Sequence, residues 1–404
     1  MPTTIQTLRG GTRLAFTAFA GITRTVEQMH ETIARRPLPW SPRPAQPTRA
    51  HGYVAAAVYA LLHGAIGACA RGADLSLGAL PDNVEETSDT PRVTRSLATL
   101  NGVCGDHLES TGNPLAIRMA LIKNGLPLDM TPAGLAATYP DASPHVVVLV
   151  HGLCLSELSW HREEQPDIGS RLRETLGMTP VYLRYNSGRH ISTNGQELSA
   201  LLDRLHAAWP TPIESLSLLG HSMGGLVIRS GCWYGNEANR PWIDSLRRVV
   251  CLGTPHHGSP VERAGHLLDL AMRKIQYVEP LMFGRHRSAG IKDLRHGNLL
   301  DEDWAKQEAG QALADRRTAV PLLDGVEHYF AAASVGRHQH DPIGHLFGDL
   351  LVQPGSARGA HTDARRHLPI DPEHCKVFHE KGHLDLLSDA EVHAQIIEWI
   401  ASAM

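Results

Sequence analysis

The chain has 404 residues and a formal net charge of −4, from 38 lysines and arginines against 42 acidic residues. Because no basic stripe is available to displace counterions from phosphates, a nucleic-acid partner is not expected. Hydrophobic residues make up 42% of the chain and no charge block dominates, which excludes a disordered chain. The six cysteines form no CxxC pair, so neither a zinc ribbon nor a disulfide framework is predicted. The length fits one large α/β domain with an accessory region, or two to three domains.

Residues 1–140 are predicted to form a helical accessory region. Apolar residues over 14–33 recur near the 3.6-residue period of a helix, which gives one apolar stripe. A proline-rich linker near 37–48 stops this helix. Further helices are expected at 53–75 and within 98–125, the latter including the run Leu115–Ile122.

Two segments of this region bear on localisation. Residues 14–20 follow Arg9 and Arg13 and end in Ala-Phe-Ala, a weak match to a signal peptide. Residues 51–70 carry no charge, but they are rich in alanine and glycine and transfer poorly into a bilayer. We therefore expect a cytoplasmic protein, with secretion or membrane-surface contact through the N-terminal helices as alternatives. No oligomeric state is predicted.

From His145 onward, short apolar runs alternate with helical patterns. Val146–Val150 is a continuous apolar run, as in a strand buried on both faces of a parallel sheet. The alternation predicts an α/β domain over 141–404 with a mostly parallel, doubly wound sheet. The interval 258–325 has helical pieces and is expected to be a cap inserted over the carboxyl edge of the sheet. Other strands are expected at 181–183, 216–219, 249–252, 329–333 and 375–378, and helices at 168–176, 197–209 and 223–234.

A nucleophile motif follows one of these strands. The run Gly220-His221-Ser222-Met223-Gly224-Gly225 is a G-x-S-x-G sequence between a predicted strand and a predicted helix. The turn is sharp, so Gly220 and Gly224 are expected where a side chain would not fit. Ser222 would then lie at the helix N-terminus, where the dipole favours developing negative charge. We predict that Ser222 is a nucleophile, with His221 supporting the turn.

A tetrahedral oxyanion requires two backbone N–H donors. One is expected from Met223, the residue after the nucleophile. The other is expected from Leu153, because His151-Gly152-Leu153 follows the strand over 146–150. Gly152 permits a tight turn there, and His151 is expected to support the loop rather than to react.

The order of a triad on this fold is serine, acid, histidine. His383 lies in the loop between the last predicted strand and the last helix, and it is favoured as base over His374 and His379. For the orienting carboxylate the sequence offers Asp341 and Asp349. Asp349 is favoured, because glycine and apolar neighbours suit a buried acceptor.

A second group of polar residues raises the alternative of a metal site. His338, His340 and Asp341 lie close in sequence, and His256-His257 follows a predicted strand. Imidazoles at positions i and i+2 of a loop present no preformed ligand face, and no fourth ligand is obvious. A polar loop is therefore favoured, and no metal is predicted.

Together these motifs resemble those of the α/β-hydrolase lipases and esterases, specifically the bacterial triacylglycerol lipases and the GPI inositol-deacylase-like lipases. The resemblance covers roughly residues 145–404, and the helical first third finds no match in the family core. It rests on His151-Gly152-Leu153, 220–225, 252–259, Gly348-Asp349 with Leu351-Val352 and Ser356-Ala357, and 382–387.

The resemblance implies hydrolysis of a carboxylic ester through an acyl-enzyme. Ser222 would attack, His383 would transfer the proton and Asp349 would fix the imidazole tautomer. Leu153 and Met223 would hold the oxyanion, and no metal or organic cofactor would be needed. The expected partner is a small-molecule or lipid ester, including polyesters. An acyltransferase with the same triad, or a non-catalytic α/β-hydrolase scaffold, are the alternatives.

Overall fold

A computed structural model of the chain provides the coordinates, and it describes most of the sequence. The predicted linker near 37–48 and much of the predicted cap over 258–325 lie outside the described residues. The described residues are 3–35, 49–79, 91–161, 165–258, 288–308, 317–338, 349, 352, 354–361 and 363–402.

The chain divides into two compact units, and the division differs from the predicted boundary at residue 140. Residues 117–140 belong to the unit that contains the sheet, because their two strands extend it. The first unit includes Met1–Thr90 and Leu108–Ala116, and the second includes Pro91–His107, Ile117–Lys274 and Arg287–Met404.

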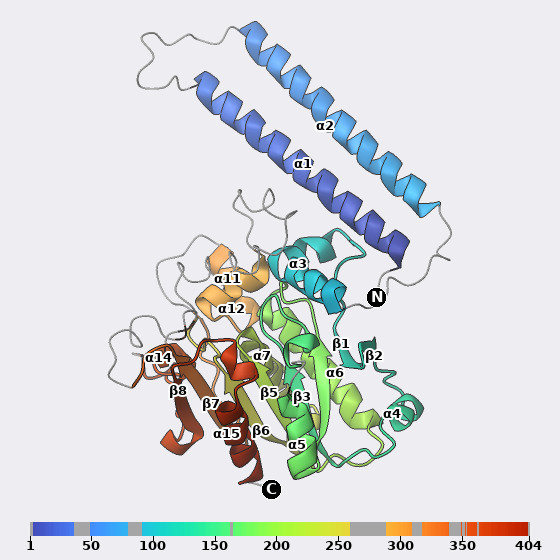
Figure 1. Ribbon diagram of the computed structural model, residues 1–404. Coiled ribbons are helices and arrows are strands. Elements are labelled where there is room, and N and C mark those ends of the chain that lie inside the picture. The colour runs from blue at the N-terminus through green and yellow to red at the C-terminus, as the bar shows by residue number, and fades with distance from the viewer. Residues whose placement is uncertain are drawn as a thin grey trace. The chain divides into compact units, whose positions relative to one another are not determined.

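The first unit is built on two long helices, α1 (Thr4–Arg35) and α2 (Arg49–Gly78), which lie side by side (Figure 1). Both confirm helices expected from the sequence and extend beyond them. Polar contacts join the pair: Arg13 Nε lies 2.7 Å from Asp74 Oδ1, and His63 Nε2 lies 3.0 Å from Glu27 Oε2. In the described part of the chain, no helix has both the length and the hydropathy that a membrane crossing requires.

The second unit contains one eight-stranded sheet in the order β2-β1-β4-β3-β5-β6-β7-β8. The strands from β4 to β8 along this order are parallel, and β1 and β2 form an antiparallel edge. All the strands expected from the sequence are present. The strands are β1 Ala120–Lys123, β2 Leu126–Pro127, β3 His145–Val150, β4 Thr179–Arg184, β5 Ser215–His221, β6 Leu246–Leu252, β7 Glu327–Ser334 and β8 Cys375–His379.

The expected helix over Leu115–Ile122 is wrong, because this run ends in strand β1, which pairs with β2 and β4. Asn124 and Gly125 join β1 to β2 with φ of 51° and 82°, as a two-residue hairpin turn requires. On the side of β1 opposite β2, Ala120 and Ile122 pair with β4. Sheet pairing and the Asn-Gly turn therefore override the local helical propensity of this run.

Both faces of the sheet are covered, as the doubly wound prediction requires (Figure 1). Along β3, Val147 and Leu149 face a core formed with α5 (Ile168–Leu176) and α15 (Ala390–Ala401). Val146, Val148 and Val150 face a core formed with α6 (Ile191–Ala208) and α7 (Met223–Glu237). The remaining helices and turns are α3 Pro91–Ser110, α4 Pro132–Thr138, η1 Glu157–Ser159, α8 Trp242–Ser245, α11 Ala289–His296, α12 Asp301–Glu308, α14 Pro354–Ala357, η2 Pro372–His374 and η3 Asp385–Leu387.

Candidate active site

Ser222 occupies the turn between β5 and α7. Its φ of 55° and ψ of −122° lie where residues with a side chain are rarely found, so the backbone is strained here. The turn packs against β3: a Cβ on Gly224 would lie 2.3 Å from the carbonyl oxygen of Val150. A Cβ on Gly220 would lie 2.7 Å from the amide nitrogen of Gly225. Close backbone packing therefore explains why both flanking positions are glycine.

His383 and Asp349 form a buried pair. His383 lies between β8 and η3, and its Nδ1 lies 2.6 Å from Oδ2 of Asp349. The two side chains are 4% and 1% exposed. The other carboxylate oxygen of Asp349 accepts the amide N–H of Val352 at 2.7 Å. The carboxylate therefore accepts a hydrogen bond at each oxygen, which fixes its orientation toward the imidazole.

The carboxyl end of β6 contacts both the Ser222 turn and the imidazole of His383. The amide N–H of Ser222 donates to the carbonyl oxygen of Leu252 at 2.7 Å. The next residue, Gly253, has a φ of 59°, and a Cβ there would lie 2.9 Å from Cε1 of His383. Ser222 and the ring of His383 therefore meet the two consecutive residues at the carboxyl end of β6.

His221 makes a second connection between the Ser222 turn and His383. Its Nε2–H donates to the carbonyl oxygen of His383 at 3.1 Å, and the two rings are 4.7 Å apart. Burial, and secondly the neighbouring His383, hold the pKa of His221 well below its usual range. His221 is therefore neutral and acts as a hydrogen-bond donor to the loop that carries His383. Nε2 of His383 is buried and makes no hydrogen bond with any described residue, so it is free to accept a proton.

The loop after β3 lies against the same turn. A Cβ on Gly152 would lie 3.1 Å from Cβ of Ser222, a contact tight enough that a larger residue would push on the Ser222 turn. His151 stacks on Tyr185 at 4.3 Å, and its Nδ1–H donates to the carbonyl oxygen of Gly152 at 2.9 Å. Burial lowers the pKa of His151 to about 4, which keeps the ring neutral. These contacts fit a supporting role for His151.

The two expected oxyanion donors come from this loop and from α7. Met223 is the first residue of α7, and Leu153 follows Gly152 directly. No hydrogen bond between described residues uses the amide N–H of either residue.

Helix α3 covers the loop after β3, although α3 lies within the stretch 1–140 that was expected to form an accessory region. A Cβ on Gly102 would lie 2.3 Å from Sγ of Cys154, the residue after Leu153. Cys154 has a φ of 60°, and its amide N–H donates to the hydroxyl of Ser187 at 3.0 Å. Nδ2 of Asn186 donates to the carbonyl oxygen of Gly105 at 2.9 Å. The helix kinks between these two glycines, at Cys104 (φ −141°, ψ 26°), and no sequence motif marks the close approach.

The other predicted site residues lie apart from this pair or outside the description. The ring of His374, at the amino end of β8, is tilted against the ring of Tyr329 with centroids 4.3 Å apart. His379 is the last residue of β8, and it is the imidazole of His383 that lies 2.6 Å from the carboxylate of Asp349. The rival acid Asp341 lies outside the described residues.

The residues considered for a metal do not form a ligand cluster in the described part of the chain. His256 stacks on Phe330 with ring centroids 4.2 Å apart. His257 donates through Nε2 to the carbonyl oxygen of Gly359 at 2.9 Å. His338 is exposed, and His340 lies outside the described residues.

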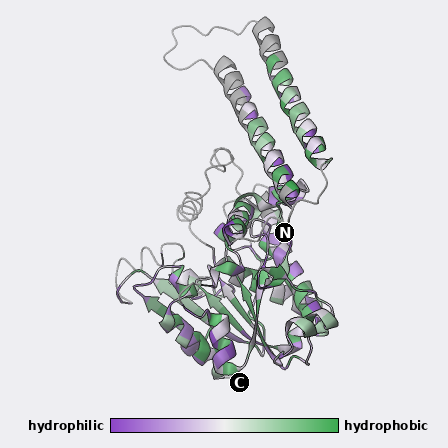
Figure 2. Cartoon of the chain, turned by 45° about the vertical axis from the view of Figure 1, so that its right-hand side comes forward, coloured by the Kyte–Doolittle hydropathy of each residue, from purple (hydrophilic) through white to green (hydrophobic). Residues whose placement is uncertain are grey.

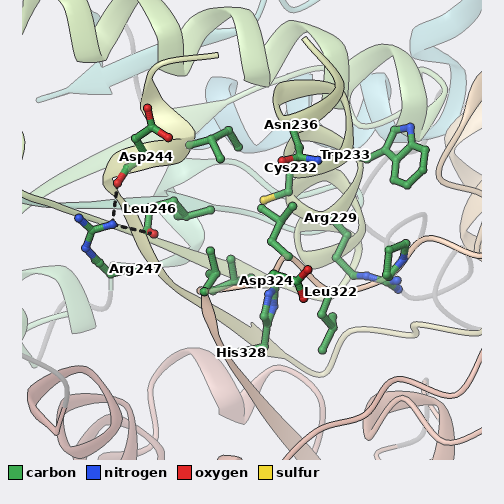
Figure 3. Close-up of a pocket in the computed structure, with 16 residues that line it drawn as sticks. Arg229, Cys232, Trp233, Asn236, Asp244, Leu246, Arg247, Leu322, Asp324 and His328 are labelled. Atoms are coloured by element: carbon green, nitrogen blue, oxygen red, sulfur yellow. Dashed lines mark hydrogen bonds between the residues drawn. The ribbon is translucent and has the colours of Figure 1, made fainter. Parts of the chain in front are cut away.

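A cavity of about 360 Å³ lies between α7, α8 and the start of β6 and β7 (Figure 3). Arg229, Arg247 and His328 are among its lining residues. Ser222 lies at the carboxyl end of β5, so this cavity opens at the opposite edge of the sheet. Burial lowers the pKa of Arg229 to about 10, and its Nη2 donates to the carbonyl oxygen of Val320 at 2.7 Å. Because the cavity and Ser222 lie at opposite edges of the sheet, the cavity is separate from the candidate active site.

Strand order, turn and residue order define the class of fold. A serine on a strained strand-to-helix turn, a loop after β3 beside it, and an acid and a histidine later in the chain characterise the α/β-hydrolase fold. The chain has this fold.

One family model and several solved structures are similar to parts of this chain. The model of the family described as "PGAP1-like alpha/beta domain" matches residues 185–308, a stretch that includes Ser222 and ends before Asp349. No curated protein matches the chain.

Several solved lipases and esterases are similar in structure at low sequence identity. A mature Bacillus licheniformis lipase is 17% identical, covering 71% of this chain and 98% of its own, with a TM-score of 0.42. Aspergillus fumigatus lipase B is 11% identical, covering 65% of this chain and 54% of its own, with a TM-score of 0.39. A Pyrococcus furiosus esterase is 13% identical, covering 65% of this chain and 83% of its own, with a TM-score of 0.38. This chain therefore spans about half of the Aspergillus lipase.

Proposed function

We propose that this protein is a serine carboxylic-ester hydrolase that works through an acyl-enzyme. The observation that carries the proposal is the Asp349–His383 pair, whose imidazole packs against Gly253 beside the Ser222 turn. A buried carboxylate on Nδ1 fixes the tautomer in which Nε2 has a free lone pair. An imidazole in that tautomer is the general base that a serine nucleophile requires.

Acylation begins when the hydroxyl oxygen of Ser222 attacks the ester carbonyl carbon and its proton passes to Nε2 of His383. The carbonyl oxygen becomes an oxyanion, which the amides of Leu153 and Met223 stabilise. The tetrahedral intermediate collapses, the C–O bond to the alcohol breaks, and the alcohol leaves with the proton from His383. Ser222 is then esterified by the acyl group.

Deacylation repeats these steps with water. His383 removes a proton from the water as the water oxygen attacks the acyl carbon. The second tetrahedral intermediate releases the free acid, and the proton returns to Ser222. The positive charge that His383 carries in each step is stabilised by Asp349. The expected substrates are small-molecule, lipid or polyester acyl esters.

Hydrolysis of p-nitrophenyl esters of graded acyl length tests this function. The wild type is expected to release nitrophenol, and Ser222→Ala is expected to lose at least about 10³-fold in kcat. Ser76→Ala, which changes an exposed serine of α2, is the matched control and is expected to keep full activity. Activity that survives in Ser222→Ala would overturn the proposal.

The fate of the acyl group separates a hydrolase from an acyltransferase. The same triad can deliver the acyl group to an alcohol, so free acid and transferred ester are measured together with an added alcohol acceptor. A hydrolase yields mainly the free acid. If the transferred ester is the main product, the protein is an acyltransferase. If none of the tested ester substrates gives any product, a non-catalytic scaffold is favoured.

A further inference from the structure

Helix α2 exposes a long uncharged face, which we name the apolar strip. Successive members of the strip are spaced mostly three or four residues apart, so they lie along one side of the helix. Leu61 and Leu75 are each 74% exposed, and Val58 and Leu62 are 48% and 45% exposed. The strip consists of Val58, Leu61, Leu62, Ala65, Ala68, Cys69, Gly72 and Leu75, all of them exposed.

The opposite side of α2 packs on α1. His63 and Asp74, which contact Glu27 and Arg13 of α1, fall between the positions of the strip. Colouring by hydropathy shows hydrophobic residues along most of α2 (Figure 2). His63 and Asp74 of α2 thus contact α1, whereas the apolar strip is exposed and can bind another partner.

The same region of the chain is basic although the whole chain is acidic. Residues 1–80 contain eight arginines and only three acidic residues, whereas the net charge of the protein is −4. Arg24 and Arg71, on α1 and α2, are exposed. An exposed apolar face next to an arginine excess is complementary to a surface that is apolar inside and negatively charged outside.

We propose that the α1–α2 pair docks on an anionic lipid bilayer. The apolar strip lies at the boundary between headgroups and acyl chains, and the arginines contact lipid phosphates. The pair lies in the plane of the surface, since no described helix has the properties of a membrane-spanning segment. Pairing of the strip with a second copy is disfavoured, because it would bring together two regions with the same excess of arginine. This surface goes beyond the proposed hydrolase activity and does not depend on it.

Vesicle flotation with the full chain tests the proposal. The protein is mixed with vesicles of phosphatidylcholine alone, or of phosphatidylcholine with phosphatidylglycerol, and floated through a density gradient. We expect flotation with the anionic vesicles and a loss of flotation at high salt. Wild-type protein that stays at the bottom with both vesicles would overturn the proposal.

The double variant Leu61→Glu/Leu75→Glu tests the strip itself. Because each buried leucine contributes about a factor of ten or more, partitioning is expected to fall at least about tenfold. Leu126→Glu is the matched control: Leu126 is 61% exposed on β2, and the variant is expected to float as wild type does. Equal flotation of the double variant and the control would overturn the assignment of the strip.

Light scattering on the same proteins tests the competing occupant. A wild-type oligomer that becomes monomeric in Leu61→Glu/Leu75→Glu, without any vesicle binding, would assign the strip to a second copy and overturn the proposal. Circular dichroism checks that the double variant keeps its helices. Ser222→Ala is expected to float as wild type does, so failure of the hydrolase assignment is distinguishable from failure of the docking surface.

Discussion

Nδ1 of His383 lies 2.6 Å from Oδ2 of Asp349, although 34 residues separate them in the sequence. Both side chains are almost completely buried, and the second oxygen of Asp349 accepts the amide of Val352. An Asn at position 349 would keep the shape, but its amide NH₂ could face Nδ1 and select the other tautomer. Asp349→Asn is therefore expected to lower kcat by about 10³- to 10⁴-fold with little change in folding.

The comparison variant for this prediction is Asp341→Asn, which changes the rival acid. Steady-state kinetics on one nitrophenyl ester measures both. A large loss in Asp341→Asn together with a small loss in Asp349→Asn would reassign the acid.

The backbone strain at Ser222 predicts a difference between two inactive variants. Because φ is 55° and ψ is −122°, glycine relieves the strain at this position and alanine does not. Ser222→Gly is expected to be more stable than Ser222→Ala by about 1 kcal/mol. Urea unfolding of the two variants measures the difference. Equal or reversed stabilities would mean that the turn does not store strain.

Gly102 on α3 is expected to matter for the reaction through its contact with the loop after β3, which carries the proposed oxyanion donor Leu153. Gly102→Ala places a Cβ within 2.3 Å of Sγ of Cys154, so the loop that carries the Leu153 amide must shift. We expect kcat to fall about tenfold or more with a smaller change in KM, because oxyanion stabilisation acts in the transition state. Stability is expected to fall by about 1–3 kcal/mol.

A matched glycine distinguishes this effect from a general effect of alanine. A Cβ on Gly11, in α1, would meet nothing within 4 Å. Gly11→Ala is expected to raise stability by up to about 1 kcal/mol and to leave kcat unchanged. Unaltered kcat in Gly102→Ala would refute the role of α3.

Most of the sheet could be predicted from the sequence because its strands are buried on both faces. The run Val146–Val150 had to be continuously apolar, since alternate side chains enter different cores. Strand β1 is different, because its position depends on pairing with β4 and on the turn at Asn124-Gly125 rather than on its own composition. The prediction of a helix there failed for that reason.

The candidate site could be predicted where local chain geometry determines the residue type. Ser222 was recognisable from the glycines that its sharp turn requires, and His383 from its position after the last strand. The contact of Gly102 with Cys154 could not be predicted, because the two residues are far apart in sequence and neither belongs to a motif. The catalytic roles of Ser222, His383 and Asp349 stay predictions until they are measured.

Buried histidines predict that acid destabilises the fold. Burial lowers the pKa of His151, His257 and His328 to about 4 in the folded protein, whereas the pKa of a histidine in the unfolded chain is about 6.5. Between these values the unfolded state binds protons that the folded state does not. Stability is therefore full above about pH 6.5 and is lost as the pH falls toward about 4.

The contribution of one histidine can be measured directly. His328→Gln removes one titrating group, so the slope of unfolding free energy against pH near pH 5 is expected to fall by about 1.4 kcal/mol per pH unit. Urea unfolding at several pH values gives this slope for wild type and variant. An unchanged slope would show that His328 is protonated in the folded protein.

Covalent labelling with a fluorophosphonate tests the nucleophile most directly. The probe phosphonylates a serine only where a base removes its proton and amides hold the developing oxyanion. After digestion, mass spectrometry is expected to find the probe on the peptide that contains Ser222, and no label in Ser222→Ala. Label on another residue, or equal labelling of Ser222→Ala, would contradict the account.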